Sequence, residues 1–167
     1  WDIESGESRI GVFGLMDQGS NNGRGIIPAP PDAWSRIYAG WASTINTSNF
    51  DKIELKDSLH NQILKIPINE SEYFLIENRN NWFRKGVSID SSRYTVWDKT
   101  DVYPSFINIL IDSVKVSKNE FGVISSIPNY NLGLPASGLL IWHIDEKNIN
   151  NGFKDYSINS DRQSRGI

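Results

Sequence analysis

The residues of this chain that could contribute to chemistry begin with Met16, its only methionine, within Gly-Leu-Met-Asp-Gln-Gly at positions 14–19. Glycine adopts positive φ without a steric penalty, so Gly14 and Gly19 predict a tight turn around Met16. A methionine on such a turn projects a soft, polarisable thioether towards whatever packs above it. Met16 could fill a gap in the core, which is the usual role of methionine, or it could form part of a site.

A second group of polar residues lies on or beside two expected strands, namely Glu77, Arg79, His143 and Asp145. Side chains alternate along a strand, so His143 and Asp145 are expected on one face. Histidine is the commonest metal ligand, which makes a ligand role for His143 one interpretation. The other histidine, His60, is far away in sequence, and buried polar groups are generally satisfied by hydrogen bonds. The preferred interpretation is therefore a structural ion-pair cluster of these four residues.

The segment after Asp145 is rich in oxygen-bearing side chains, and we expect residues 145–161 to form a loop. Its candidate ligands are Asn148, Asn150, Asn151, Asp155, Asn159 and Asp161. Calcium prefers such oxygen ligands, so a calcium site is one hypothesis. The spacing does not match an EF-hand loop, and Asn/Asp-rich segments commonly form turns, so no residue of the chain is assigned as a metal ligand.

Composition limits the classes of function. The 167 residues suffice for one good core, and 38% hydrophobic with 22% charged residues is typical of a globular protein. A net charge of −3 implies no basic surface for nucleic acid. No apolar run approaches the ~20 residues of a membrane span. Cysteine is absent, which excludes disulfides and thiolate ligands.

The pattern of the chain predicts a mainly-β fold, an antiparallel sheet or sandwich preceded by the glycine turn and one short helix. The helix is expected between Pro31 and Trp41, with Gly40 as a stop signal. A linker is expected at 43–49. Strands are expected at 53–55, 63–68, 73–79 and 93–97, as a hairpin of 106–116 with 121–124, and as an apolar central strand at 139–144.

Three segments of the chain resemble immune-inhibitor-A-like secreted metalloproteases. They are residues 13–41, which contain the Met16 turn, residues 72–79 (Glu-Tyr-Phe-Leu-Ile-Glu-Asn-Arg) and residues 138–146 (Gly-Leu-Leu-Ile-Trp-His-Ile-Asp-Glu). The resemblance implies that Gly14, Met16 and Gly19 belong to a Met-turn beneath a catalytic zinc. It also implies an extracellular protein that acts on protein or peptide substrates.

The zinc motif of that family, H-E-x-x-H, is not present in this chain, because neither His60 nor His143 fits it. We therefore expect an excised piece of a longer protein, without catalytic residues of its own, whose zinc ligands lie before Trp1. Residues 1–45 would be the end of the catalytic domain. Residues 46–167 would be a β-rich domain, truncated at its C-terminus, with an insertion around 80–130.

A different class of function stays open. A noncatalytic β-module could bind protein or carbohydrate through exposed aromatic side chains such as Trp82, Phe83 and Trp97. A strand-rich composition fits both classes, whereas the Met16 segment favours the protease.

Overall fold

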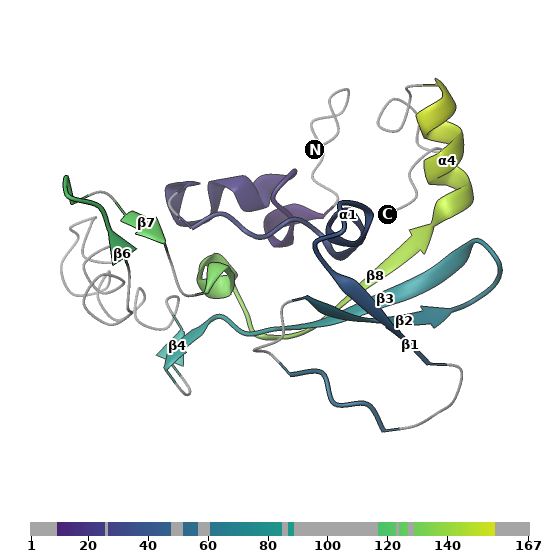
Figure 1. Ribbon diagram of the computed structural model, residues 1–167, viewed down its shortest axis with the longest axis horizontal. Coiled ribbons are helices and arrows are strands. Elements are labelled where there is room, and N and C mark those ends of the chain that lie inside the picture. Colours follow the sequence, from purple (N-terminus) through teal and green to yellow (C-terminus); the bar gives the residue numbers. More distant parts are fainter. Residues whose placement is uncertain are drawn as a thin grey trace.

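The computed structural model describes residues 10–25, 27–47, 52–56, 61–84, 87–88, 117–122, 124–126 and 129–155. Strands are the commonest regular structure in them, which confirms the mainly-β prediction (Figure 1). The strands are β1 (Ser43–Asn46), β2 (Gln62–Pro67), β3 (Glu72–Arg79), β4 (Trp82–Arg84), β5 (Val87–Ser88), β6 (Ser117–Lys118), β7 (Ile124–Ser126) and β8 (Gly138–Asp145). The helices are α1 (Ala33–Tyr38), α4 (Glu146–Asp155) and the 3-10 helices η1 (Gly11–Phe13), η2 (Gln18–Gly25) and η3 (Tyr130–Gly133).

The main sheet has four strands in the order β1-β2-β3-β8. β2 and β3 form the expected antiparallel hairpin, and their turn is closed by Asn69, whose side-chain oxygen accepts from the amides of Ser71 and Glu72 at 2.9 and 2.8 Å. β3 pairs antiparallel with β8 along its whole length, from Glu72 opposite Asp145 to Arg79 opposite Gly138. β2 and β3 are thus the interior strands of this sheet, and β3 joins the β1-β2 pair to β8.

β1 differs from the sequence prediction in two ways. Residues 43–49 were predicted to be a linker, but Ser43–Asn46 is a strand that pairs parallel with β2, so the sheet is mixed rather than antiparallel. Thr44 and Ile45 are β-branched, which favours a strand. The short Ser/Thr/Asn-rich sequence around them is also typical of a linker, so the strand was not predicted. The predicted domain boundary between residues 45 and 46 therefore falls inside a strand of the sheet.

β8 lies at the end of the sheet among the described strands, and not at its centre as predicted. Trp142 and Ile144 are buried on the inner face, but Leu139 and Ile141 on the outer face are 64% and 58% exposed. A continuous apolar run predicts burial on both faces. The apolar pattern alone does not indicate whether a strand lies between two other strands or at the end of the sheet.

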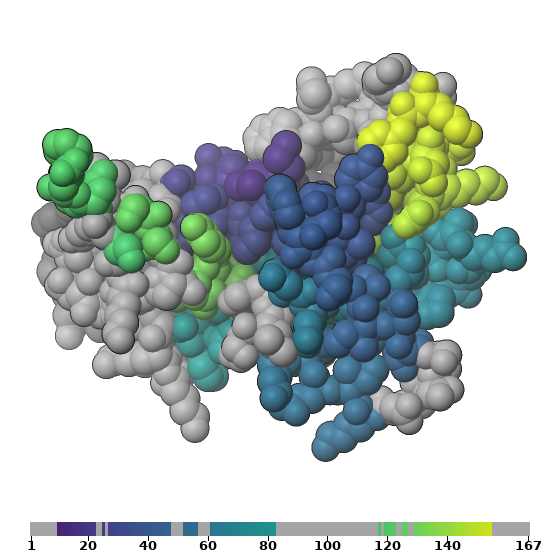
Figure 2. Space-filling view, in the orientation of Figure 1, coloured from purple at the N-terminus to yellow at the C-terminus, as the bar shows by residue number. Residues whose placement is uncertain are grey.

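α1 confirms the predicted helix and explains its limits. Asp32 caps it by accepting from the amide and the hydroxyl of Ser35 at 2.9 and 2.7 Å. Gly40, with a φ of 73°, follows its C-terminal end, where a left-handed residue favours glycine. The buried Ala33 packs from α1 into the core formed by the inner face of the sheet. In the space-filling view, the purple surface of the first described residues adjoins the blue surface of α1 (Figure 2).

The prediction of a loop after Asp145 is wrong for the ten residues that follow it, because Glu146–Asp155 forms α4. Asp145 starts the helix by accepting from the amide of Asn148 at 3.1 Å. Ile149 is buried in the core, and Phe153 stacks with Tyr38 of α1 at a ring separation of 6.0 Å. Capping and tertiary packing outweigh the low helix propensity of an Asn-rich sequence.

The remaining predictions concern short or undescribed segments. Residues 52–56 contain no strand, although one was predicted around 53–55. β6 and β7 form a hairpin shifted by a few residues from the predicted one, while 93–97 and 106–116 lie outside the described residues. None of the described helices is long and apolar enough to cross a membrane.

Candidate functional site

The Met16 turn is held in place by backbone hydrogen bonds on both sides of the methionine. The amide of Leu15 donates to the carbonyl oxygen of Pro30 at 3.2 Å, and the amide of Asp17 donates to that of Gly14 at 3.2 Å. Met16 itself is 78% exposed. The core-filling interpretation of Met16 is therefore wrong within the described structure, and the thioether projects outward from a fixed turn.

The buried carboxylate of Asp17 organises the backbone around this turn. One oxygen accepts from the amides of Ile10 and Gly11, each at 2.9 Å, and the other accepts from the amide of Gln18 at 2.8 Å. These bonds satisfy amides that begin η1 and η2, where donors have no helical partner. Asp17 is thus a structural residue that fixes the path of the chain before and after Met16.

Gly14 and Gly19 are needed for close approach and not for positive φ, contrary to the sequence prediction. Gly14 has an extended φ of −125°, and Gly19 is not among the glycines with positive φ. A Cβ at Gly19 would lie 2.4 Å from the carbonyl oxygen of Gly14 and 2.8 Å from the Cβ of Ala29. A Cβ at Gly14 would lie 2.7 Å from the side chain of Ile10. The turn is folded back on itself so tightly that side chains cannot enter.

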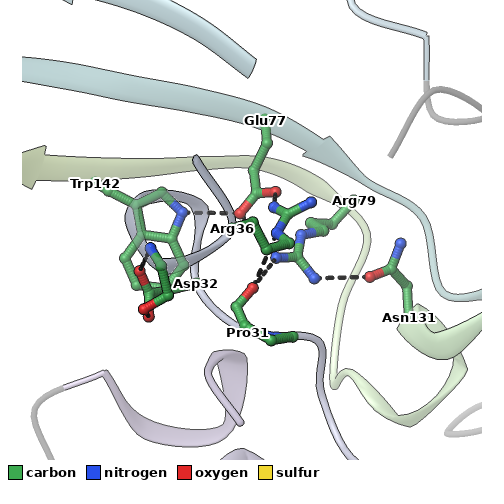
Figure 3. A network of polar contacts seen from close by, with 8 residues as sticks. Pro31, Asp32, Arg36, Glu77, Arg79, Asn131 and Trp142 are labelled. Carbon is green, nitrogen blue, oxygen red and sulfur yellow. Dashed lines mark hydrogen bonds and ion pairs between the residues drawn. The ribbon is translucent and has the colours of Figure 1, made fainter. Parts of the chain in front are cut away.

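A buried ion network lies where α1 meets the inner face of the sheet (Figure 3). Glu77 of β3 pairs through one oxygen with Arg36 of α1. Its other oxygen accepts from Arg79 at 2.8 Å and from the indole of Trp142 in β8 at 2.9 Å. Each of these side chains is less than a tenth exposed. A buried carboxylate held by two guanidinium groups and an indole joins three elements at one point.

The two arginines of this network extend it to neighbouring segments. Arg36 Nε donates to the carbonyl oxygen of Pro31 at 3.0 Å, and Arg79 Nη2 lies 3.5 Å from the same oxygen. Arg79 Nη1 donates to the side-chain oxygen of Asn131 in η3 at 2.9 Å. The network therefore connects the sheet to the segment before α1 and to η3.

Electrostatics favour the ionised state of this network. Burial alone would raise the pKa of Glu77, but the charge of Arg79, hydrogen bonds from Arg79 and Trp142, and the charge of Arg36 together hold it below its ordinary value. Burial lowers the pKa of Arg36, with Glu77 opposing the effect. Arginine has so high an intrinsic pKa that Arg36 stays charged. The site is a structural ion cluster without a group suited to accept a proton near neutral pH.

The structure brings together two of the four residues predicted for the polar cluster. Glu77 and Arg79 are in it, but His143 lies on the opposite, exposed face of the sheet. There its Nε2 lies 3.1 Å from the carboxylate of Glu72, and its ring packs against Phe74. Asp145 binds the backbone and side chain of Asn148. The prediction of a buried His143 was wrong because alternation fixes which residues share a face and not which face is covered.

Sequence reasoning missed Arg36, Trp142 and Asn131 as members of the network. Arg36 is three residues after the buried Ala33 and therefore lies on nearly the same side of α1. A lone arginine on the apolar side of a short helix signals a buried ion pair. Asn131 had no comparable signal, because its contact with Arg79 depends on the path of η3.

No metal centre is visible in the described part of the chain. Among those residues, no group of three or more His, Cys, Asp or Glu side chains is placed to hold a metal ion. The predicted calcium segment is helical through residue 155, and Asn159 and Asp161 lie outside the described residues. These residues do not offer a zinc ligand set.

No protein-family model, curated protein or solved structure matches this chain.

Proposed function

We propose that this chain is part of a secreted zinc endopeptidase and supplies the Met-turn that lies beneath the zinc site. The observation that carries the proposal is the 78% exposure of Met16 at the apex of a turn pinned by Pro30, Gly14 and Asp17. A large apolar side chain on a rigid, outward-facing turn is suited to pack beneath a second surface. The resemblance of residues 13–41, 72–79 and 138–146 to immune-inhibitor-A-like proteases indicates what that surface is.

The contribution of this chain to such an enzyme would be shape and rigidity. Zinc, held by residues outside this chain, would supply the Lewis acid of peptide hydrolysis. Met16 would touch the ligand side chains from below without binding the metal. Gly14 and Gly19 would let the turn fold closely enough to present the thioether. The isolated chain, which lacks H-E-x-x-H, is expected to bind zinc weakly and to hydrolyse no protein.

The alternative is a noncatalytic β-module that binds protein or carbohydrate through aromatic side chains. Its specific support is the exposure of Trp82, at 43%, together with Trp41, at 64%. Exposed tryptophan is enriched at binding surfaces because it combines a large apolar face with one hydrogen-bond donor. The side chain of Phe83 and all of Trp97 lie outside the described residues.

One experiment separates the two functions. The parent protein that contains this chain is purified, and its zinc content and its hydrolysis of casein with and without a chelator are measured. The protease proposal predicts about one zinc per molecule and chelator-sensitive hydrolysis, as for a zincin site. A parent without zinc or hydrolysis, whose binding to a glycan or protein array falls on Trp82→Ala, would instead support the binding module.

A further inference from the structure

Two chains of contacts lead from β3 towards the Met16 turn, and both start at the buried ion network. We infer that this network positions the Met16 turn, with Arg36 as the positioning residue that transmits the constraint. The coupling is a property of this chain. Its consequence for a zinc site is that the sheet would fix the position and orientation of Met16 beneath the zinc, and this consequence rests on the proposed function.

The first route runs through the segment before α1. Glu77 holds Arg36, and Arg36 Nε donates to the carbonyl oxygen of Pro31 at 3.0 Å. The preceding carbonyl, that of Pro30, accepts from the amide of Leu15, the residue before Met16. Proline has a fixed φ, so the orientation of one of these carbonyls constrains the other. A change in the position of Arg36 is therefore transmitted to Leu15 over a stiff Pro-Pro segment.

The second route runs through η3. Arg79 binds Asn131, and two residues later Gly133 lies directly against the chain that follows η2. A Cβ at Gly133 would come within 2.2 Å of the carbonyl oxygen of Ile27 and 3.1 Å of the Cβ of Asn22. Asn22 in turn donates from its side chain to the carbonyl oxygen of Val12 at 2.8 Å. This route reaches Val12 of η1, in the segment that leads into the Met16 turn.

The effect of Arg36 on the Met16 turn can be measured separately from its effect on the stability of the whole fold, because Glu77 has a second partner. Glu77 pairs with both arginines, so a variant without Arg36 still has a one-to-one pair of Glu77 with Arg79. Arg36→Met keeps an apolar stem of similar length in the core and removes the bond to Pro31. The sheet then retains its ladder and its buried pair, whereas the first route to Leu15 is weakened to the 3.5 Å contact of Arg79 Nη2 with the carbonyl oxygen of Pro31.

The test is amide hydrogen exchange of the whole chain, read residue by residue by NMR. Arg36→Met is expected to accelerate exchange of the Leu15 amide about tenfold more than exchange of the amides of Tyr73–Ile76 in β3, where the strand is paired with β2 on one side and β8 on the other. Because Met16 is the only methionine, its 13C-labelled methyl group gives one signal, which should shift in the variant. Glu72→Gln, which removes a carboxylate from the exposed face of the same strand, is the control and should change neither readout.

Equal acceleration at Leu15 and in β3 would mean that Arg36 only stabilises the fold, and unchanged exchange at Leu15 would mean that it does not reach the turn. Either result overturns the inference. If Arg36→Met does not fold, Arg36→Lys keeps the charge but loses the guanidinium fork, and the same ratio of exchange rates decides the question. None of these readouts requires zinc, so a failure of the coupling leaves the proposed function standing, and a parent without zinc leaves the coupling standing.

Discussion

Arg36 of α1 and Glu77 of β3, 41 residues apart in sequence, form a buried ion pair between the segment that carries Met16 and the sheet. Ala33 of the same helix packs into the core with Leu75 of the same strand. The Met16 segment and the sheet therefore share one core and one ion network in the described residues. A mutation in the sheet is therefore expected to affect the turn.

Glu77→Gln should destabilise the chain by about 3–5 kcal/mol, because it leaves two buried arginines without a counter-charge. The free energy of unfolding in urea gives the measurement. Glu72→Gln on the exposed face is the matched control, and it should cost less than about 1 kcal/mol as an exposed ion pair. Equal effects of the two variants would show that the Glu77 network contributes no more than a surface contact.

Stability should fall in acid through the titration of Glu77. Its folded pKa lies below the ordinary value of 4.5, so its contribution is fully present above that pH and is lost as pH falls through the folded pKa. Trp142→Phe removes one hydrogen bond that lowers this pKa and should make the acid-dependent loss of stability shallower. Urea midpoints measured from about pH 7 to about pH 3 test this. Parallel curves for the two proteins would contradict it.

Gly19→Ala should destabilise the chain by about 3 kcal/mol, at the upper end for overpacking, because the new methyl group meets the backbone of Gly14. Gly40→Ala is a useful comparison, since Gly40 has positive φ but open space around it, and should cost about 1 kcal/mol. Thermal unfolding of both variants shows which substitution lowers stability more. If Gly40→Ala is the more destabilising, positive φ and not close approach determines where the chain requires glycine.

His143→Ala should change stability by less than about 1 kcal/mol, because the ring is half-exposed and its partner Glu72 is also partly solvated. A buried cluster would have implied a larger loss. The urea midpoint of the variant, compared with that of Trp142→Phe on the buried face, measures the difference. A His143 variant that unfolds as readily as the Trp142 variant would contradict the observed orientation of β8.

Local patterns predicted α1, the β2–β3 hairpin and the strand character of β8, because Asp32, Asn69 and the apolar run at 139–144 carry strong local signals. The sequence did not predict the parallel pairing of β1, or that β8 is the last strand of the sheet among the described residues. Both depend on contacts between distant segments. α4 was missed because its stability comes from Ile149 and Phe153 packing on other elements, and not from its own propensities.

The candidate site was predictable to a similar extent. Glu77 and Arg79 were recognised as members of an ion cluster, since charged residues in an apolar strand require partners. Their true partners, Arg36 and Trp142, come from elements whose packing the sequence alone does not fix. Gly14 and Gly19 were expected to need positive φ, whereas in the structure steric closeness between segments leaves no room for a Cβ at either position.

Substitution of Met16 in the parent protein tests most directly the proposal that Met16 lies beneath a zinc site. Met16→Leu nearly conserves volume and should leave zinc content and peptide hydrolysis close to those of the wild type, at a cost below about 1.5 kcal/mol. Met16→Asp places a charge where an apolar surface is expected and should lower zinc retention and hydrolysis together. The measurement is bound zinc per molecule, with hydrolysis of a peptide substrate, for both variants. Wild-type zinc content and activity in Met16→Asp would show that Met16 does not lie beneath the zinc.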